Sequence, residues 1–215
     1  MADFLWQERA GGKRGPKPAL TLEAIADVAI AVADAEGLDA VTMQRVAADL
    51  GYTKMALYRY LPGKTELVAV MLERVMGAAP TLPEAGWRDA LITWTKCLLS
   101  VFLRHSWALV ASTGKRPIGP HELDWMEAAL ARMPAGLTGA ERMDTVAILA
   151  AQVRALAMQP DESGMITALT EHAARFPAVT AAIADMTAHG GQDQALSFGL
   201  ERILDGLEAL LAKRV

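Results

Sequence analysis

The chain has 215 residues, of which 53% are hydrophobic, and its formal net charge is −4. This hydrophobic content excludes intrinsic disorder, and the length suits two modest domains with cores of their own. The single cysteine, Cys97, cannot form an intrachain disulfide, and the first residues lack the layout of a secretory signal, so we expect a reducing, cytoplasmic location. Because charged residues such as Lys96 and Arg104 interrupt the apolar stretches, we expect no membrane span.

The distribution of charge matters more than its sum. A net negative charge argues against a nucleic-acid partner, but over the first 65 residues basic and acidic side chains balance, eight of each. Between positions 9 and 17 there are basic residues, including Arg14 and Lys17, and no acidic ones, and the Gly and Pro content disfavours a helix. We interpret residues 1–19 as a flexible basic arm that contacts DNA, with a solvated tail as the alternative.

The spacing of apolar residues predicts an all-α fold. Strand-like alternation is absent, and apolar residues recur three and four positions apart. Before residue 80 we expect helices at 22–36, behind the cap Thr21; at 43–50, behind the cap Thr42; at 54–60; and at 66–79. The Pro- and Gly-containing segment 80–86 indicates a boundary between a domain at 20–79 and a second domain at 86–215.

The second domain is expected to be larger and also helical. In chain order we expect a helix around Leu91 to Phe102 that breaks near His105, a loop at 115–120, a helix around 126–133, a long helix at 139–159, shorter helices at 166–175 and 178–188, and a last helix at 194–213.

Residues 42–64 have the spacing of a helix-turn-helix. That motif holds two short helices at a steep angle, so their contact must be small and the turn must tolerate left-handed backbone angles. Ala47 and Gly51 meet these two demands. The spacing also predicts a small shared core of Val46, Leu57 and Tyr60.

The second helix of this motif is expected to turn one face outward. That face carries Tyr52, Thr53, Lys54, Met55, Ala56, Tyr58 and Arg59. Hydroxyls and cations suit phosphates, whereas small or apolar groups suit base edges and thymine methyls. We therefore predict that this helix enters the major groove of DNA.

Residues 12–68 resemble the DNA-binding domain of TetR-family (tetracycline-repressor-like) transcriptional regulators. The matching features are Arg14-Gly15-Pro16, Glu36-Gly37-Leu38, Leu50-Gly51-Tyr52, and Ala56-Leu57-Tyr58-Arg59-Tyr60 followed by Gly63-Lys64. The C-terminal half is similar, more loosely, to a TetR-family ligand domain through Gly86-Trp87-Arg88, Arg116-Pro117-Ile118-Gly119-Pro120, Phe198-Gly199-Leu200 and Leu204-Asp205-Gly206-Leu207.

This resemblance implies an N-terminal helix-turn-helix domain of three to four helices and a larger helical domain for ligand binding and dimerisation. It implies phosphate contacts from Thr42, Thr53, Tyr58, Tyr60 and Lys64, and it places Lys54, Met55 and Ala56 nearest the base edges. Family members often carry Ser-Pro or a small residue where this chain has Thr53-Lys54-Met55. The operator sequence therefore cannot be taken from the family.

The resemblance also assigns dimerisation to two long helices, which would form a four-helix bundle with a partner chain. Paired reading heads suit half-sites about 34–36 Å apart. The apolar stripes are Val146, Leu149, Ala150, Val153 and Ala157 in one helix, and Leu200, Ile203, Leu204, Leu207 and Leu211 in the other. Ordinary core packing is the alternative for both stripes.

Aromatic and methionine side chains in the second domain suit the wall of a small-molecule cavity. The candidates are Trp94, Phe102, His105, Trp107, Trp125, Met126, Met133, Arg154 and Met158. Plain core packing is the alternative for the apolar residues. His105 also fits a helix-end cap or a hydrogen-bonded core histidine, and Arg154 fits an anion anchor, a dimer contact or a surface residue.

No catalytic residue, metal site or cofactor is predicted. The four histidines lack the close pairing of zinc sites, and there is no glycine-rich phosphate loop. The main hypothesis is a homodimeric repressor that a small-molecule effector releases from a double-stranded DNA operator. The alternatives are a helical ligand-binding protein or enzyme with a purely structural N-terminal hairpin, and a TetR-like activator without a ligand.

Overall fold

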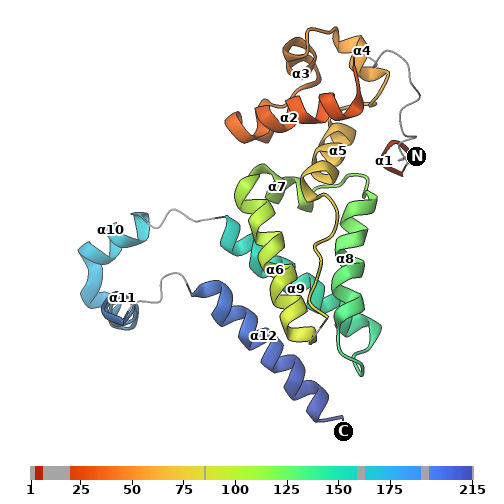
Figure 1. Ribbon diagram of the computed structural model, residues 1–215. Helices are drawn as coiled ribbons and strands as arrows, with labels where there is room; N and C mark the ends of the chain where they lie inside the picture. Colours follow the sequence, from red (N-terminus) through yellow and green to blue (C-terminus); the bar gives the residue numbers. More distant parts are fainter. Residues whose placement is uncertain (1–2, 7–19, 85, 159–162, 190–193, 215) are drawn as a thin grey trace. The chain divides into compact units, whose positions relative to one another are not determined.

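The computed structural model describes residues 3–6, 20–84, 86–158, 163–189 and 194–214 (Figure 1). All regular secondary structure in these segments is helical, which confirms the predicted fold class. The chain divides into two compact units, Met1–Pro134 and Ala135–Val215.

The N-terminal helices of the first unit are α2 (Leu22–Glu36), α3 (Met43–Asp49), α4 (Lys54–Tyr58) and α5 (Lys64–Met76), with a short 3₁₀ turn at Leu38–Ala40. The hydroxyl of Thr21 accepts the N–H of Ala24 and so caps α2, as its position predicts. The helix expected at 66–79 instead begins at Lys64. It stops at Met76 because Gly77 adopts a φ of 58°, which an α-helix cannot continue.

The core of this head, residues 20–76, lies where α2 packs against α3 and α5. The fully buried side chains include Ile25, Val46, Leu57, Leu61 and Leu67. The predicted pairing of Val46 with Leu57 thus lies in the core, but the inclusion of Tyr60 was wrong. Its ring is half-exposed, and the next residue, Leu61, fills the core position because the chain leaves α4 at Tyr58.

A short helix, α1 (Asp3–Trp6), lies within the segment expected to be a flexible arm. Leu5 is buried, and the indole of Trp6 donates to the carbonyl of Ile118 at 3.3 Å. The prediction of an arm over residues 1–19 was therefore wrong at 3–6, because two large apolar side chains find partners there. Arg14 and Lys17 lie outside the described residues.

The first unit continues with α6 (Trp87–Arg104), α7 (Trp107–Thr113) and α8 (Pro120–Arg132). The predicted break near His105 is confirmed, since that residue ends α6. α5 packs against both α7 and α8. The expected domain boundary at 80–86 therefore falls inside the first compact unit.

The second unit contains α9 (Gly139–Ala157), α10 (Ser163–His172), a 3₁₀ turn at Ala173–Arg175, α11 (Pro177–His189) and α12 (Ala195–Ala212). α9 packs against α12, whereas α10 and α11 contain no buried residue. None of the described helices is long and apolar enough to cross a membrane.

Candidate nucleic-acid interface

The turn between α3 and α4 depends on one glycine. Gly51 has a φ of 74°, a region that residues with a Cβ rarely occupy, although a Cβ there would meet no atom within 4 Å. The N–H of Tyr52 then donates to the carbonyl of Ala47 at 2.8 Å, which closes the turn. Ala47 is itself buried, so its small side chain permits the close approach of the two helices.

The start of α3 is capped locally. The hydroxyl of Thr42 accepts the N–H of Arg45 at 3.0 Å, yet the residue remains exposed. An exposed hydroxyl at this helix start can still donate to a phosphate oxygen, the role that the resemblance implies.

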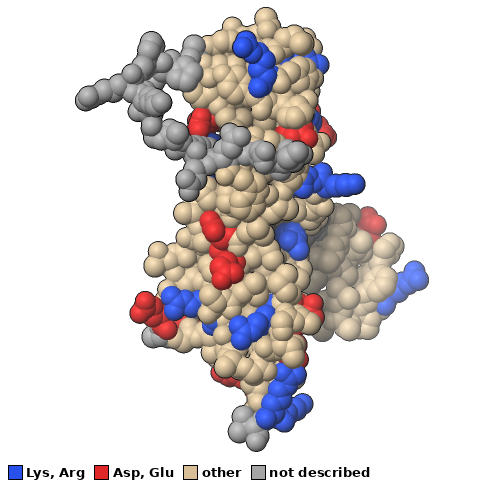
Figure 2. Space-filling view, turned by 90° about the vertical axis from the view of Figure 1, so that its right-hand side faces the viewer, with Lys and Arg blue, Asp and Glu red and all other residues tan. Residues whose placement is uncertain are grey.

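The face of α4 that the sequence predicts to turn outward does so. Met55 is 71% exposed, Tyr58 is 38% exposed, and Thr53, Lys54 and Arg59 are also exposed. The remaining predicted members, Tyr52 and Ala56, are half-buried. Figure 2 shows Lys and Arg side chains on the end of the first unit that carries this motif, within a largely uncharged surface.

The cations near this face differ in their partners. Arg45 binds Glu36 and Asp49, each at 2.8 Å, and these carboxylates raise the pKa of its guanidinium. Lys64 donates to the carbonyl of Leu38 at 2.9 Å. The ammonium of Lys54 lies 5.4 Å from the ring centre of Tyr58, one turn further along α4. Arg45 therefore braces the fold, while Lys54 stays at the exposed face.

Tyr60 is tied to the start of the described head. Its hydroxyl donates to the carbonyl of Leu20 at 2.8 Å. This bond uses the only proton of the hydroxyl, so a phosphate contact by Tyr60, as the resemblance implies, requires that bond to be exchanged.

The predicted dimerisation residues differ in burial. The side chains of Val146, Leu149, Val153, Ala157, Leu200 and Leu204 are buried within one chain, and Ala150, Ile203, Leu207 and Leu211 are half-buried. The buried members pack within their own chain, whereas the half-buried members keep surface that a partner chain can cover. The exposed faces of the same two helices also carry Met143, Ala147, Ile148, Ala151 and Phe198.

Most of the predicted ligand-binding aromatic side chains are buried. Trp94, Phe102, Trp107, Trp125 and Met133 all lie in the core, Met126 and Arg154 are half-buried, and Met158 is exposed. The indole N–H of Trp94 donates to the carbonyl of Trp125 at 2.8 Å, and the two rings meet edge to face. These tryptophans thus already hold polar partners within the protein.

His105 and Trp107 share one acceptor in the head. The Nδ1 atom of His105 lies 2.9 Å from Oδ1 of Asp34 in α2, and the indole N–H of Trp107 donates to the same oxygen at 2.7 Å. His105 is therefore a hydrogen-bonded residue at the end of α6, one of the alternatives that the sequence left open. Asp34 joins α2 to the start of α7.

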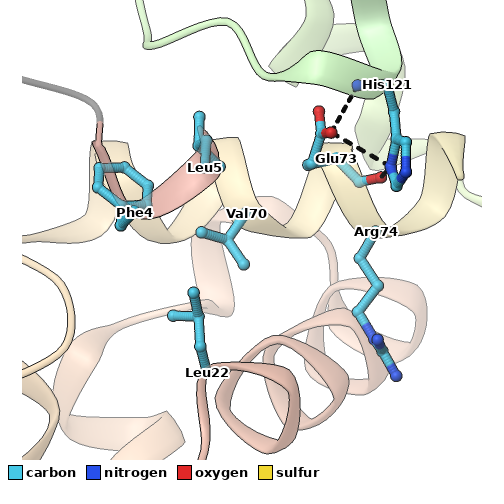
Figure 3. Close-up of a pocket in the computed structure, with 7 residues that line it drawn as sticks. All are labelled: Phe4, Leu5, Leu22, Val70, Glu73, Arg74 and His121. Carbon is cyan, nitrogen blue, oxygen red and sulfur yellow. Dashed lines mark hydrogen bonds and ion pairs between the residues drawn. The ribbon is translucent and has the colours of Figure 1, made fainter. Parts of the chain in front are cut away.

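A second link joins α5 to α8 (Figure 3). Glu73, together with Phe4, Leu5 and His121, lines a cavity of about 120 Å³, and its Oε1 accepts the backbone N–H of His121 at 2.6 Å. Burial raises the pKa of the Glu73 carboxyl, while the bond from the N–H of His121 acts in the opposite direction.

Asp34 and Glu73 were not predicted from the sequence. Glu73 follows Val70 by three positions and so lies on the apolar stripe of α5, and an acidic residue on such a stripe is a signal of a buried polar contact. Asp34 gives no comparable signal. Among the described residues, no group of three His, Cys, Asp or Glu side chains could hold a metal ion.

Comparison with known proteins gives two family matches. Residues 19–71 match the model of bacterial regulatory proteins of the tetR family, and residues 79–211 match the tetracyclin repressor-like C-terminal domain. The chain is 36% identical, over 99% of its length and 86% of the relative's, to the HTH-type transcriptional repressor DrrR1 of Streptomyces coeruleorubidus.

Solved structures share the fold. The Streptomyces coelicolor TetR family protein ActR in complex with actinorhodin has a TM-score of 0.76 and 25% identity, over 91% of this chain and 99% of that one. Apo ActR has a TM-score of 0.77 and 24% identity, over 92% and 99%.

A helix-turn-helix with an exposed second helix, attached to a larger helical region, defines a DNA-binding transcriptional regulator. The chain belongs to the TetR family of such regulators.

Proposed function

We propose that this regulator is a repressor that binds a double-stranded DNA operator and leaves it when a small-molecule effector binds. The exposed face of α4 carries the proposal, because Met55 and Lys54 extend outward from a turn that Gly51 and buried Ala47 hold in place. Two relatives support the proposal. DrrR1 is a transcriptional repressor, which supports repression, and ActR forms a complex with actinorhodin, which supports a small-molecule effector. We assign no catalytic activity and place the protein with DNA in the cytoplasm.

The residues of α4 divide into two roles in this proposal. Lys54, Met55 and Ala56, at the start of the helix, approach base edges, where their contacts depend on sequence. Phosphate contacts come from Thr42, Tyr52, Thr53, Tyr58, Arg59, Tyr60 and Lys64 and position the helix on any duplex. This division predicts that the two groups respond differently to substitution.

The effector and the DNA are proposed to compete through two conformations of one protein. An effector changes DNA affinity only if it binds one conformation better than the other. We place the effector in the helical region after residue 86 because of its aromatic and methionine content. The indole N–H groups of Trp94, Trp107 and Trp125 already have acceptors within the protein, and an effector reaches their buried rings only in a conformation that exposes them.

A homodimer is proposed to form through the exposed faces of α9 and α12. Ile148 is 52% exposed and Phe198 is 63% exposed, and the small residues Ala147 and Ala151 lie on the same helix as Ile148. Exposed large apolar side chains beside small ones permit close packing of helices.

The dimer is tested by sedimentation equilibrium. We expect the wild type to be a dimer and Ile148→Asp to be a folded monomer. Val110→Asp, an equally disruptive change at an exposed residue of α7, is the matched control and should remain dimeric. A monomeric wild type, or a dimeric Ile148→Asp protein, would show that this interface is wrong.

Operator binding and release are tested by a gel shift on DNA from upstream of the protein's own gene. We expect a specific complex at low salt, weakened as salt rises because phosphate contacts release counterions. Compounds that raise the melting temperature of the free protein are then added to the complex, since a ligand stabilises the state that it binds. The proposal fails if low salt gives no specific complex, or if every stabilising compound leaves the complex intact.

A further inference from the structure

The N-terminus of α8 is capped by a residue from another helix. A helix leaves its first N–H groups without intrahelical partners, and a nearby side-chain oxygen usually accepts one of them. At α8 the capping position is Gly119, which has no side chain to offer. Glu73 of α5 supplies the acceptor instead, through the 2.6 Å bond from the N–H of His121 to its Oε1. Its negative charge also suits a helix N-terminus.

α8 in return covers the C-terminal carbonyls of α5. The Nδ1 atom of His121 lies 2.9 Å from the carbonyl oxygen of Glu73, and since a carbonyl only accepts, Nδ1 carries the proton. Trp125, four residues further and thus on the same face of α8, donates its indole N–H to the carbonyls of Met76 and Gly77, each at 3.2 Å. We name Glu73, Gly119, His121 and Trp125 the α5–α8 clamp.

Gly119 is needed for space rather than for backbone freedom. Its φ of −98° is ordinary for any residue. A Cβ at this position, however, would collide with Oε2 of Glu73 and lie 2.5 Å from its Cδ. Glu73 is only 8% exposed, and Oε2 has no hydrogen-bond partner among the described residues. The carboxylate is thus fixed between α5 and the backbone of Gly119.

We propose that the α5–α8 clamp positions the recognition helix, with Glu73 and Gly119 as positioning residues for DNA binding. α5 begins at Lys64, six residues after α4 ends, and Glu73 lies near its other end. Because a helix of this length is nearly rigid, a shift of α8 against α5 reorients the start of α5 and with it α4. This proposal rests on the proposed function, since it concerns how DNA affinity is set.

The clamp can be broken without removing any of its contacting side chains. Gly119→Ala adds a Cβ that displaces the Glu73 carboxylate. In the double variant Glu73→Ala/Gly119→Ala the carboxylate is absent, so the new Cβ no longer collides with it. Gly114→Ala is the matched control, because Gly114 lies in the same loop and has a φ of −74°. A Cβ there would lie 3.6 Å from the carbonyl oxygen of Ala111, an ordinary contact.

The probe is a DNA duplex that the wild type selects from a random pool. We expect Gly119→Ala and Glu73→Ala each to weaken binding by about fivefold or more, the lower range of measured coupling between sites. Gly114→Ala should bind like the wild type. Adding Gly119→Ala to Glu73→Ala should change the affinity by less than about twofold, since the two changes break the same contact.

A clamp that only stabilises the fold would behave differently. It would lower the melting temperature of both single variants and leave the affinity of the folded protein unchanged, and this result would overturn the proposal. If Gly119→Ala does not fold, Glu73→Ala decides on the same criterion.

Amide hydrogen exchange separates a failure of this proposal from a failure of the proposed function. If the wild type selects no duplex, the proposed function fails, and the clamp is judged by exchange alone. We expect Gly119→Ala to speed exchange both at 121–125 and in α4 at 54–58. A change confined to 121–125 would overturn the positioning role.

Discussion

At the scale of single residues, the molecule relies on carboxylates that hold helices together. Asp34 accepts from both His105 and Trp107, and Glu73 caps α8. Trp107 is buried, so its indole N–H has no access to water as a substitute partner. A buried donor that loses its acceptor retains the whole cost of its desolvation.

We therefore expect Asp34→Ala to lower the free energy of unfolding by about 1–3 kcal/mol, the usual cost of an unsatisfied buried polar group. Asp39→Ala, at an exposed acidic residue of the neighbouring 3₁₀ turn, should change it by less than about 0.5 kcal/mol. Urea unfolding of both variants provides the measurement. Equal effects would show that Asp34 is an ordinary surface residue.

Residue roles were predictable from the sequence only where one helix face determines them. The outward face of α4 was predicted because the helix is short and its one buried residue, Leu57, sets the register. The dimerisation stripes could not be assigned to a partner chain from the sequence, because periodicity identifies a covered face without saying what covers it. Val146 and Leu149 are covered within their own chain. The partners of His105 could not be predicted, since Asp34 is 71 positions away in sequence.

At the scale of elements, the packing of α9 against α12 depends on a second glycine. A Cβ on Gly199 would collide with the amide nitrogen of Gln152 and lie 2.9 Å from its Cδ. That amide also donates to the carbonyls of Ala195 and Leu196, at 3.3 and 3.2 Å, so it is not free to move aside without loss.

Gly199→Ala should accordingly destabilise the protein by about 1–3 kcal/mol, as overpacking does. Gly206→Ala on the same helix has open space around the new Cβ, so the higher helix propensity of alanine should stabilise it by up to about 1 kcal/mol. Chemical denaturation of the two variants should give changes of opposite sign. The same sign for both would contradict this account of α12.

The start of α9 predicts a pH dependence. Nη2 of Arg214 donates to Oε1 of Glu141 at 2.5 Å, and the backbone N–H of Thr138 donates to its Oε2 at 2.8 Å. Both contacts favour the charged carboxylate and lower the pKa of Glu141 to about 2. A carboxyl whose pKa is lower in the folded protein contributes stability above its unfolded pKa, near 4.5. That contribution is lost as the pH falls from about 4.5 towards 2.

Arg214→Ala should raise the pKa of Glu141, because it removes the ion pair that favours the charged carboxylate. NMR titration of the side-chain carboxyl measures the shift. Arg202→Ala, which removes an ion pair with Asp205 in the same helix, should leave the titration of Glu141 unchanged. An unchanged pKa in Arg214→Ala would mean that the Thr138 cap alone sets it.

At the scale of the whole molecule, local sequence patterns place the helices, whereas contacts between distant segments group them. Apolar periodicity and capping residues placed the main helices to within a few residues, since these are local properties. The compact units divide after Pro134, because the contacts of α5 with α7 and α8 join segments far apart in sequence. The domain boundary at 80–86 stays a prediction. Such contacts depend on side chains such as Glu73, whose partner no local pattern identifies.

In the proposed function, α4 reads DNA bases through its first residues. The decisive measurement is the selection of duplexes from a random pool, carried out with the wild type and with Lys54→Ala/Met55→Ala. We predict that the wild type enriches a palindromic sequence and that the variant enriches a different one at the same positions of each half-site. No enrichment by the wild type at low salt, or an identical sequence from both proteins, would show that α4 does not read bases in this way.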